Sequence, residues 1–212
     1  MTETDFDKSV FINCPIDDDF APLLEVIMFC IVYAGLKPRL SSERLDSGES
    51  RLDKIIELIS SCAFSVHDLS RCKAREADEF FRMNMPFEFG VDMGFRRSPD
   101  VRTDRKKFII FEKEQYDLKE ALSDIAGFDV EFHQDDFQLV IKKLRDFLTV
   151  EVGCELPGPT NLVGEYVTFL GWMSEKKMSQ GLTEKEALEL PTQERLKEMF
   201  EWKKSGCPSE LV

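Results

Sequence analysis

The chain has 212 residues, enough for one domain of ordinary size with an appended segment. Hydrophobic residues make up 42% of it and charged residues 33%, and its 18 phenylalanines favour a packed core over wholesale disorder. The 41 acidic and 28 basic side chains give a net charge of −13, which repels phosphate backbones and anionic membranes. We therefore expect no direct nucleic-acid binding and no membrane association, whereas a small anionic ligand remains compatible with this charge.

The cysteines and the N-terminus bear on the compartment. No stretch approaches the ~20 apolar residues of a membrane span, and the acidic N-terminus does not resemble a signal peptide. The six cysteines include no CxxC pair, and only two histidines are present, so neither a disulfide scaffold nor a zinc site is expected. These features predict a reduced, soluble, cytoplasmic protein without a bound metal or cofactor.

Strand and helix patterns alternate through residues 1–150. Short apolar runs predict strands at 9–13, 36–40, 62–66 and 107–111, with a further one at 129–132. Between them, longer runs with helical spacing predict helices at 20–34, 51–61 and 85–95, and another through 140–148. Such alternation predicts an α/β domain in three layers, a parallel sheet of flavodoxin-like or TIR-like type between helices.

Residues 151–212 differ in character and are predicted to form a helical C-terminal extension. A linker, Leu156-Pro-Gly-Pro159, precedes two or three helical segments. A group of apolar residues in them either covers the domain or pairs subunits into a homo-oligomer: Tyr166, Phe169, Leu170, Trp172 and Met173.

Ligands of parallel sheets bind beyond the carboxyl ends of the strands, so the loops after Ile12, Leu40, Val66 and Phe111 are the ones to inspect. Asn13, Cys14 and Pro15 begin the first of these loops. Backbone N–H groups and the Asn13 amide there are suited to holding a ligand, whereas Cys14 lacks an obvious histidine partner for nucleophilic catalysis.

The loop before residue 51 is a second candidate. Ser47, Gly48 and Arg51 lie at the start of a predicted helix, an arrangement that suits phosphate or ribose contacts. It lacks the glycine pattern and lysine of a P-loop, which disfavours NTP hydrolysis. A solvated capping loop explains the same residues equally well.

Glu88 is the most informative acidic residue. Asn84 is a plausible N-cap, and Pro86 is tolerated in a first helical turn, so Glu88 is expected near the positive end of a helix, which favours its ionised form. Gly90 and Gly94 suggest that a strand or ligand approaches this helix closely. The alternative is an ordinary first-turn acid with glycines that fit the helix to the sheet.

Asp68 ends a predicted central strand. A carboxylate at this edge can bind ribose hydroxyls or act as an acid or base, although Asp-Leu-Ser is also an ordinary turn sequence. We expect the neighbouring His67 to be a structural histidine.

The order of these motifs resembles the nucleoside 2-deoxyribosyltransferase-like group, which is related in fold to bacterial TIR domains. The resemblance covers roughly residues 9–112. It rests on a polar–Pro loop after the first strand and on three further segments: Val66-His-Asp-Leu69, Met85-Pro-Phe-Glu-Phe-Gly-Val-Asp-Met-Gly94 and Phe108-Ile-Ile-Phe111. Phe11-Ile-Asn-Cys-Pro15, Asp46-Ser-Gly48 and Gly127-Phe-Asp-Val130 also look like a bacterial family of TIR-like proteins, and relatives of that fold act in antiphage defence.

The resemblance implies cleavage of an N-glycosidic bond in NAD, a nucleoside or a nucleotide. It assigns the catalytic carboxylate to Glu88 and a second catalytic or substrate-holding role to Asp68, with Asn84 and Asp92 as substrate-binding neighbours. The transferases carry a second Asp shortly before the Glu, where this chain has Arg82, Met83 and Asn84. That departure favours a NAD-like substrate. The competing interpretation is a non-catalytic module that senses nucleotides or assembles as TIR-like domains do.

Overall fold

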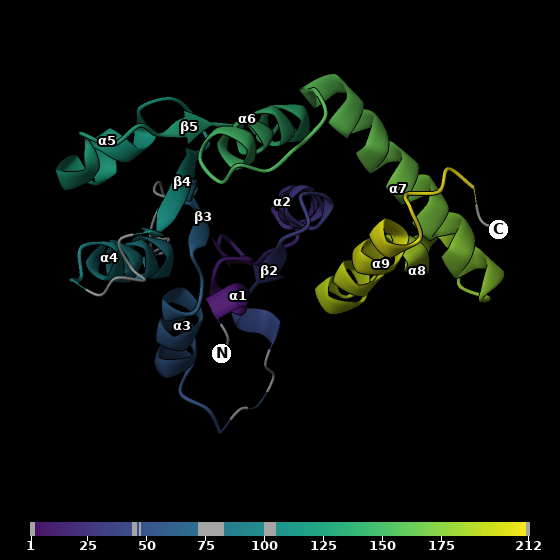
Figure 1. Ribbon diagram of the computed structural model, residues 1–212, viewed down its shortest axis with the longest axis horizontal. Helices are drawn as coiled ribbons and strands as arrows, with labels where there is room; N and C mark the ends of the chain where they lie inside the picture. Colours follow the sequence, from purple (N-terminus) through teal and green to yellow (C-terminus); the bar gives the residue numbers. More distant parts are fainter. Residues whose placement is uncertain (1–2, 44–45, 47, 72–82, 100–104, 211–212) are drawn as a thin grey trace, which may run out of the picture.

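The structure is a computed structural model whose described residues are 3–43, 46, 48–71, 83–99 and 105–210 (Figure 1). Five parallel strands form one sheet in the order β2-β1-β3-β4-β5. Their bounds are Ser9–Asn13 for β1, Lys37–Arg39 for β2, Phe64–Asp68 for β3, Lys107–Glu112 for β4 and Glu131–Phe132 for β5. The predicted parallel α/β architecture is confirmed. The strand order reverses beside β1, because β2 lies on one side of it and β3 on the other.

Helices cover both faces of the sheet. On one face lie α2 (Ala21–Tyr33) and α6 (Phe137–Val150), and on the other lie α3 (Arg51–Ser60) and α4 (Asn84–Arg96) (Figure 1). Side chains of β1 alternate between the two: Val10 and Ile12 join the core beneath α2, whereas Phe11 joins the one beneath α3. Short helices, α1 (Glu3–Phe6), α5 (Asp117–Ala121) and the 3-10 turns Ser41–Glu43 and Ser123–Ile125, complete this part.

The predicted elements differ from the observed ones mainly at their ends. β2 is shorter than expected by one residue at each end, and β5 begins two residues later than expected, at Glu131. β3 begins and ends two residues later than the apolar run suggests, so His67 and Asp68 belong to the strand itself. Both of these polar side chains are therefore buried parts of β3 and do not belong to the loop after the strand.

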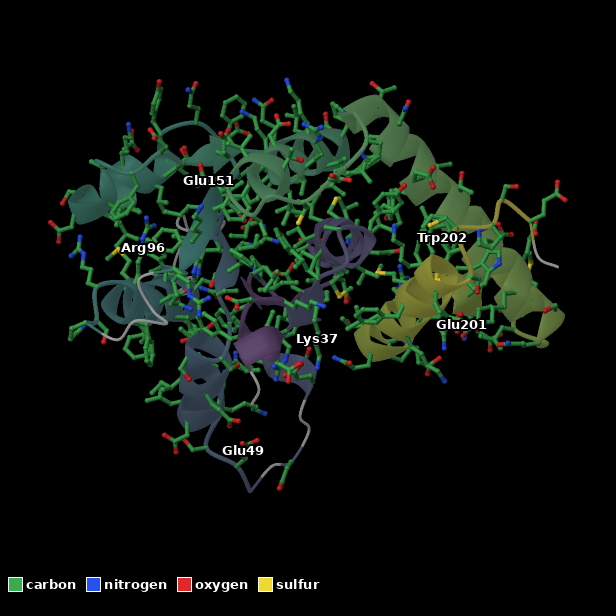
Figure 2. The ribbon with its side chains drawn as sticks, viewed as in Figure 1. Lys37, Glu49, Arg96, Glu151, Glu201 and Trp202 are labelled. Atoms are coloured by element: carbon green, nitrogen blue, oxygen red, sulfur yellow. The ribbon has the colours of Figure 1, made fainter. Side chains whose placement is uncertain are left out.

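The C-terminal segment forms α7 (Pro159–Ser179), α8 (Glu184–Leu188) and α9 (Thr192–Lys204); α7 and α9 lie against α2, and α8 lies against α7 (Figure 1). The ring of Phe29 on α2 lies 5.7 Å from that of Phe169 and 5.8 Å from that of Trp202. Trp202, labelled in Figure 2, lies on α9 beside α7. Of the five apolar residues singled out in this segment, all but the half-buried Leu170 are buried in this same core. They cover α2 within the chain, and pairing of subunits stays a prediction.

Within the described ranges, no helix has both the length and the apolar character needed to span a bilayer.

Candidate functional site

A cavity of about 440 Å³ opens at the carboxyl ends of β1 and β2, next to the first turns of α3 and α4. It therefore lies where the strand order reverses, the position that ligands take in parallel α/β sheets. Two of the four loops predicted from the sequence contribute to it, those after Ile12 and Leu40. The lining residues are Ile12, Asn13, Cys14, Ile16, Leu40, Ser41, Arg51, Asn84, Met85 and Glu88.

Glu88 contributes the carboxylate of this cavity. Its side chain is 9% exposed, and Arg51 Nη2 lies 3.9 Å from its Oε1. Burial raises the pKa of Glu88 to about 7, and the positive charge of Arg51 opposes this only in part. The expectation that the helix end favours the ionised form is thus wrong. Glu88 lies in the second turn of α4, beyond the free N–H groups, and the cost of desolvation dominates.

The start of α4 differs from the prediction in its cap. Met83 occupies the N-cap position and makes no side-chain capping hydrogen bond, so Asn84 is the first helical residue. Asn84 is exposed and lines the cavity. The two glycines also need another explanation, because a Cβ added to Gly90 or Gly94 would meet nothing within 4 Å. Nothing approaches either glycine closely among the described residues.

Asn13 ends β1 and is fixed by two hydrogen bonds. Its Nδ2 lies 3.1 Å from Nδ1 of His67, on the neighbouring strand, and donates to the carbonyl oxygen of Met85 at 2.8 Å. His67 is fully buried, and its Nε2 lies 3.0 Å from Oδ2 of Asp92. The prediction of a structural His67 is confirmed.

Asp92 lies behind the cavity and does not line it. It is fully buried and also accepts a hydrogen bond from Ser65, and its Oδ1 forms an ion pair with the Lys106 ammonium at 2.9 Å. Burial alone would raise the pKa of Asp92, but the hydrogen bond with His67, the positive charge of Lys106 and the hydrogen bond from Ser65 outweigh it and lower the pKa to about 2. Asp92 is therefore ionised and paired with other groups inside the protein. It was predicted to bind substrate, but it does not line the cavity.

Asp68 does not line the cavity and is held by other partners. One carboxylate oxygen accepts from the backbone N–H and hydroxyl of Ser70, and the other lies 3.1 Å from Nε2 of the buried His133. It is not part of the lining around Glu88. Asp68 therefore does not supply a second acid opposite Glu88.

The remaining candidates divide between the cavity and its surroundings. Cys14 lines it, and burial, followed by the charges of nearby carboxylates, raises the pKa of its thiol well above the ordinary value, so it is a neutral contact. Arg51 lies at the rim with 62% of its side chain exposed. Pro15 is buried beside the cavity, and Gly48 is exposed in a turn closed by Asp46. Ser47 lies outside the described residues.

Lys106 and His133 are two buried groups near the site that the sequence analysis did not predict. Lys106 directly precedes β4 and its Nζ also donates to the carbonyl oxygens of Ile59 and Cys62. A lysine next to an apolar strand is usually assigned to the surface, so only the three-dimensional position of its acceptors reveals this role. Among the described residues, no group of three or more His, Cys, Asp or Glu is placed to hold a metal ion.

Fold and cavity together define a parallel α/β protein with a desolvated carboxylate at its switch point. No known protein family, curated protein or solved structure matches the chain.

Proposed function

We propose that this protein cleaves the N-glycosidic bond of NAD or of a related nucleoside or nucleotide, with Glu88 as the catalytic carboxylate. The observation that carries the proposal is the position of Glu88: a buried carboxyl group with a pKa of about 7 in the wall of a 440 Å³ cavity. Perturbed carboxyl groups in clefts are typical of catalytic sites. The resemblance of the surrounding motif to that of N-glycosidic-bond enzymes agrees with this assignment.

The chemistry needs one anionic group at the sugar. The C1′–N bond breaks with its electron pair leaving on the base, and the cationic character that develops on the sugar is stabilised by the Glu88 carboxylate. Water or another acceptor then bonds to C1′ and releases its proton. Arg51 at the rim is suited to a phosphate group of the substrate.

A NAD-like substrate agrees best with the surroundings of Glu88. Nicotinamide leaves a pyridinium as a neutral base and needs no general acid, which fits the engagement of Asp68 with Ser70 and His133. The positive charge of the pyridinium also favours the ionised form of the neighbouring carboxyl group. A neutral nucleoside would supply no such charge.

The test compares Glu88→Gln with Glu194→Gln, a change of the same kind on the exposed surface of α9. Each protein is incubated with NAD, adenosine and AMP, and the products are identified by mass spectrometry. We expect the released base with the unmodified protein and with Glu194→Gln, and a loss of about a hundredfold or more with Glu88→Gln. Full turnover by Glu88→Gln contradicts the mechanism. Tight binding of a nucleotide without turnover by any of the three proteins would favour the nucleotide-sensing alternative.

A further inference from the structure

Asn13 presents only one kind of polar group to a ligand. Its Nδ2 has two hydrogens, and it has two partners, His67 Nδ1 and the carbonyl oxygen of Met85. The other amide atom, Oδ1, receives no hydrogen bond from the described residues, and Asn13 is part of the cavity wall. What remains for a ligand is therefore a hydrogen-bond acceptor.

The orientation of this amide depends on which nitrogen of His67 carries the proton. Asp92 is ionised and can only accept, so His67 Nε2 must donate to it. The Met85 carbonyl can only accept, so the amide group beside it is the NH₂ of Asn13, and His67 Nδ1, which faces the same NH₂, accepts from it. An amide rotated by 180° would place Oδ1 against that lone pair and against the Met85 carbonyl, which is unfavourable at both contacts.

The contacts that run from Asn13 through His67 to Asp92 end at Lys106. Its ammonium donates to the carbonyl oxygens of Ile59 and Cys62 and forms an ion pair with Asp92 Oδ1, 2.9 Å away. The charged amine thus keeps Asp92 ionised, and Asp92 in turn sets the tautomer of His67. We call Lys106, Asp92 and His67 the Lys106 network. All three are buried, with 2% exposure or less.

We propose that the Lys106 network holds the Asn13 amide with Oδ1 toward the cavity, and that this oxygen accepts a hydrogen bond from a ribose hydroxyl of the substrate. The inference rests on the proposed function and narrows it. The substrate is a ribonucleoside or ribonucleotide, and an analogue that lacks the bound hydroxyl leaves Oδ1 unpaired in a desolvated wall. Asn13 is then a specificity-determining residue, and the three residues of the network are positioning residues.

Binding to the Glu88→Gln variant isolates recognition from turnover. The probes are nicotinamide riboside and adenosine, each compared with its 2′-deoxy and 3′-deoxy forms, and dissociation constants are measured by isothermal titration calorimetry. We expect one of the two deoxy forms to bind about tenfold more weakly than the ribonucleoside. If the ribonucleosides bind and both deoxy forms bind equally well, the inference is wrong while the proposed function stands. If no nucleoside binds, the proposed function fails as well.

Asp92→Asn tests the positioning role with almost no change in shape. Lys106 requires an acceptor, so it draws the oxygen of the new amide, and the NH₂ group then faces His67 Nε2. His67 must accept there and carry its proton on Nδ1, which forces the Asn13 amide to turn. In the double variant Asp92→Asn with Glu88→Gln, we expect ribonucleosides and deoxyribonucleosides to bind with about equal affinity.

The tautomer itself has a spectroscopic signature in ¹⁵N NMR of the imidazole rings. The chain has only two histidines, and His133 is the internal reference, since its Nδ1 accepts from the backbone of Asp135. We expect Asp92→Asn to move the proton of His67 from Nε2 to Nδ1 and to leave His133 unchanged. An unmoved proton with a lost preference would overturn the positioning role.

Asn13→Leu keeps the test decisive if Asp92→Asn does not fold. Leucine has the same number of side-chain heavy atoms as asparagine, cannot form hydrogen bonds, and leaves the buried pair of Lys106 and Asp92 in place. In the Glu88→Gln background it should bind ribonucleosides and deoxyribonucleosides with equal affinity. A preference that survives in Asn13→Leu would assign the discrimination to another residue and overturn the inference.

Discussion

Glu88 combines a chemical role with a cost to the fold. Burial raises its pKa from the ordinary value of 4.5 to about 7, so the folded protein keeps a proton here that the unfolded chain releases. Below pH 4.5 both states are protonated and the group has no effect. As the pH rises from 4.5 through 7, the unfolded state is increasingly favoured, by up to about 3 kcal/mol.

This linkage predicts the stability of Glu88→Gln. Glutamine cannot ionise, so the variant should gain up to about 3 kcal/mol relative to the unmodified protein between pH 4.5 and pH 8. Urea unfolding at these two pH values measures the difference, because every other titrating group is present in both proteins. Glu194→Gln is the matched control and should show a much smaller change. A constant difference between Glu88→Gln and the unmodified protein would mean that the carboxyl group is not desolvated.

At the scale of elements, α4 contains two glycines that the packing does not require. Both Gly90 and Gly94 lie in a right-handed helix, are exposed and have open space around the position of a Cβ. A glycine in a helix interior costs up to about 1 kcal/mol relative to alanine. Their effect on stability therefore comes from the unfolded chain and not from a contact in the folded one.

Gly90→Ala and Gly94→Ala should each raise the free energy of unfolding by roughly 0.5–1 kcal/mol. Gly35→Ala is the control of opposite sign, because Gly35 follows α2 with a φ of 78°, where an L-residue is strained. Urea titrations of the three variants measure these changes. A glycine-to-alanine change in α4 that lowered stability would indicate that something occupies this face of the helix in solution. Activity loss with unchanged stability would indicate that a substrate does.

The elements were largely predictable from the sequence, whereas the site was predictable only in outline. Apolar runs such as 9–13 and 107–111 have one stable solution, a buried strand, and Glu88 was found from its neighbouring motif. The pKa of Glu88 and the pairing of Asp92 were not predictable. Both depend on which groups the fold brings within a few ångströms, and Lys106, just before β4, reaches Asp92 on α4.

At the scale of the whole molecule, α2 explains why the C-terminal helices are needed. It is apolar nearly all round, and ten of its residues are buried. One side of α2 faces the sheet, and the opposite side would expose Phe29 without α7 and α9. The pattern of α2 in the sequence requires a second covering element, and the apolar residues between 166 and 173 were one candidate for it, with pairing of subunits as their alternative role. A division of the chain at residue 150 would cut through this core.

Trp202 tests whether the chain folds as one unit. Its ring is 1% exposed and contacts Phe29 and Phe169, so Trp202→Ala leaves a large cavity between α2 and α9. We expect a loss of about 3–5 kcal/mol in the free energy of unfolding. Phe200→Ala, on the same helix but 41% exposed, is the control and should cost much less. Because α2 also forms the core beneath β1, Trp202→Ala should lower the stability of the sheet and of the cavity together. Tryptophan fluorescence and far-UV circular dichroism should then report the same single unfolding transition. Two separate transitions would instead mean that the C-terminal helices fold independently of the domain that holds Glu88.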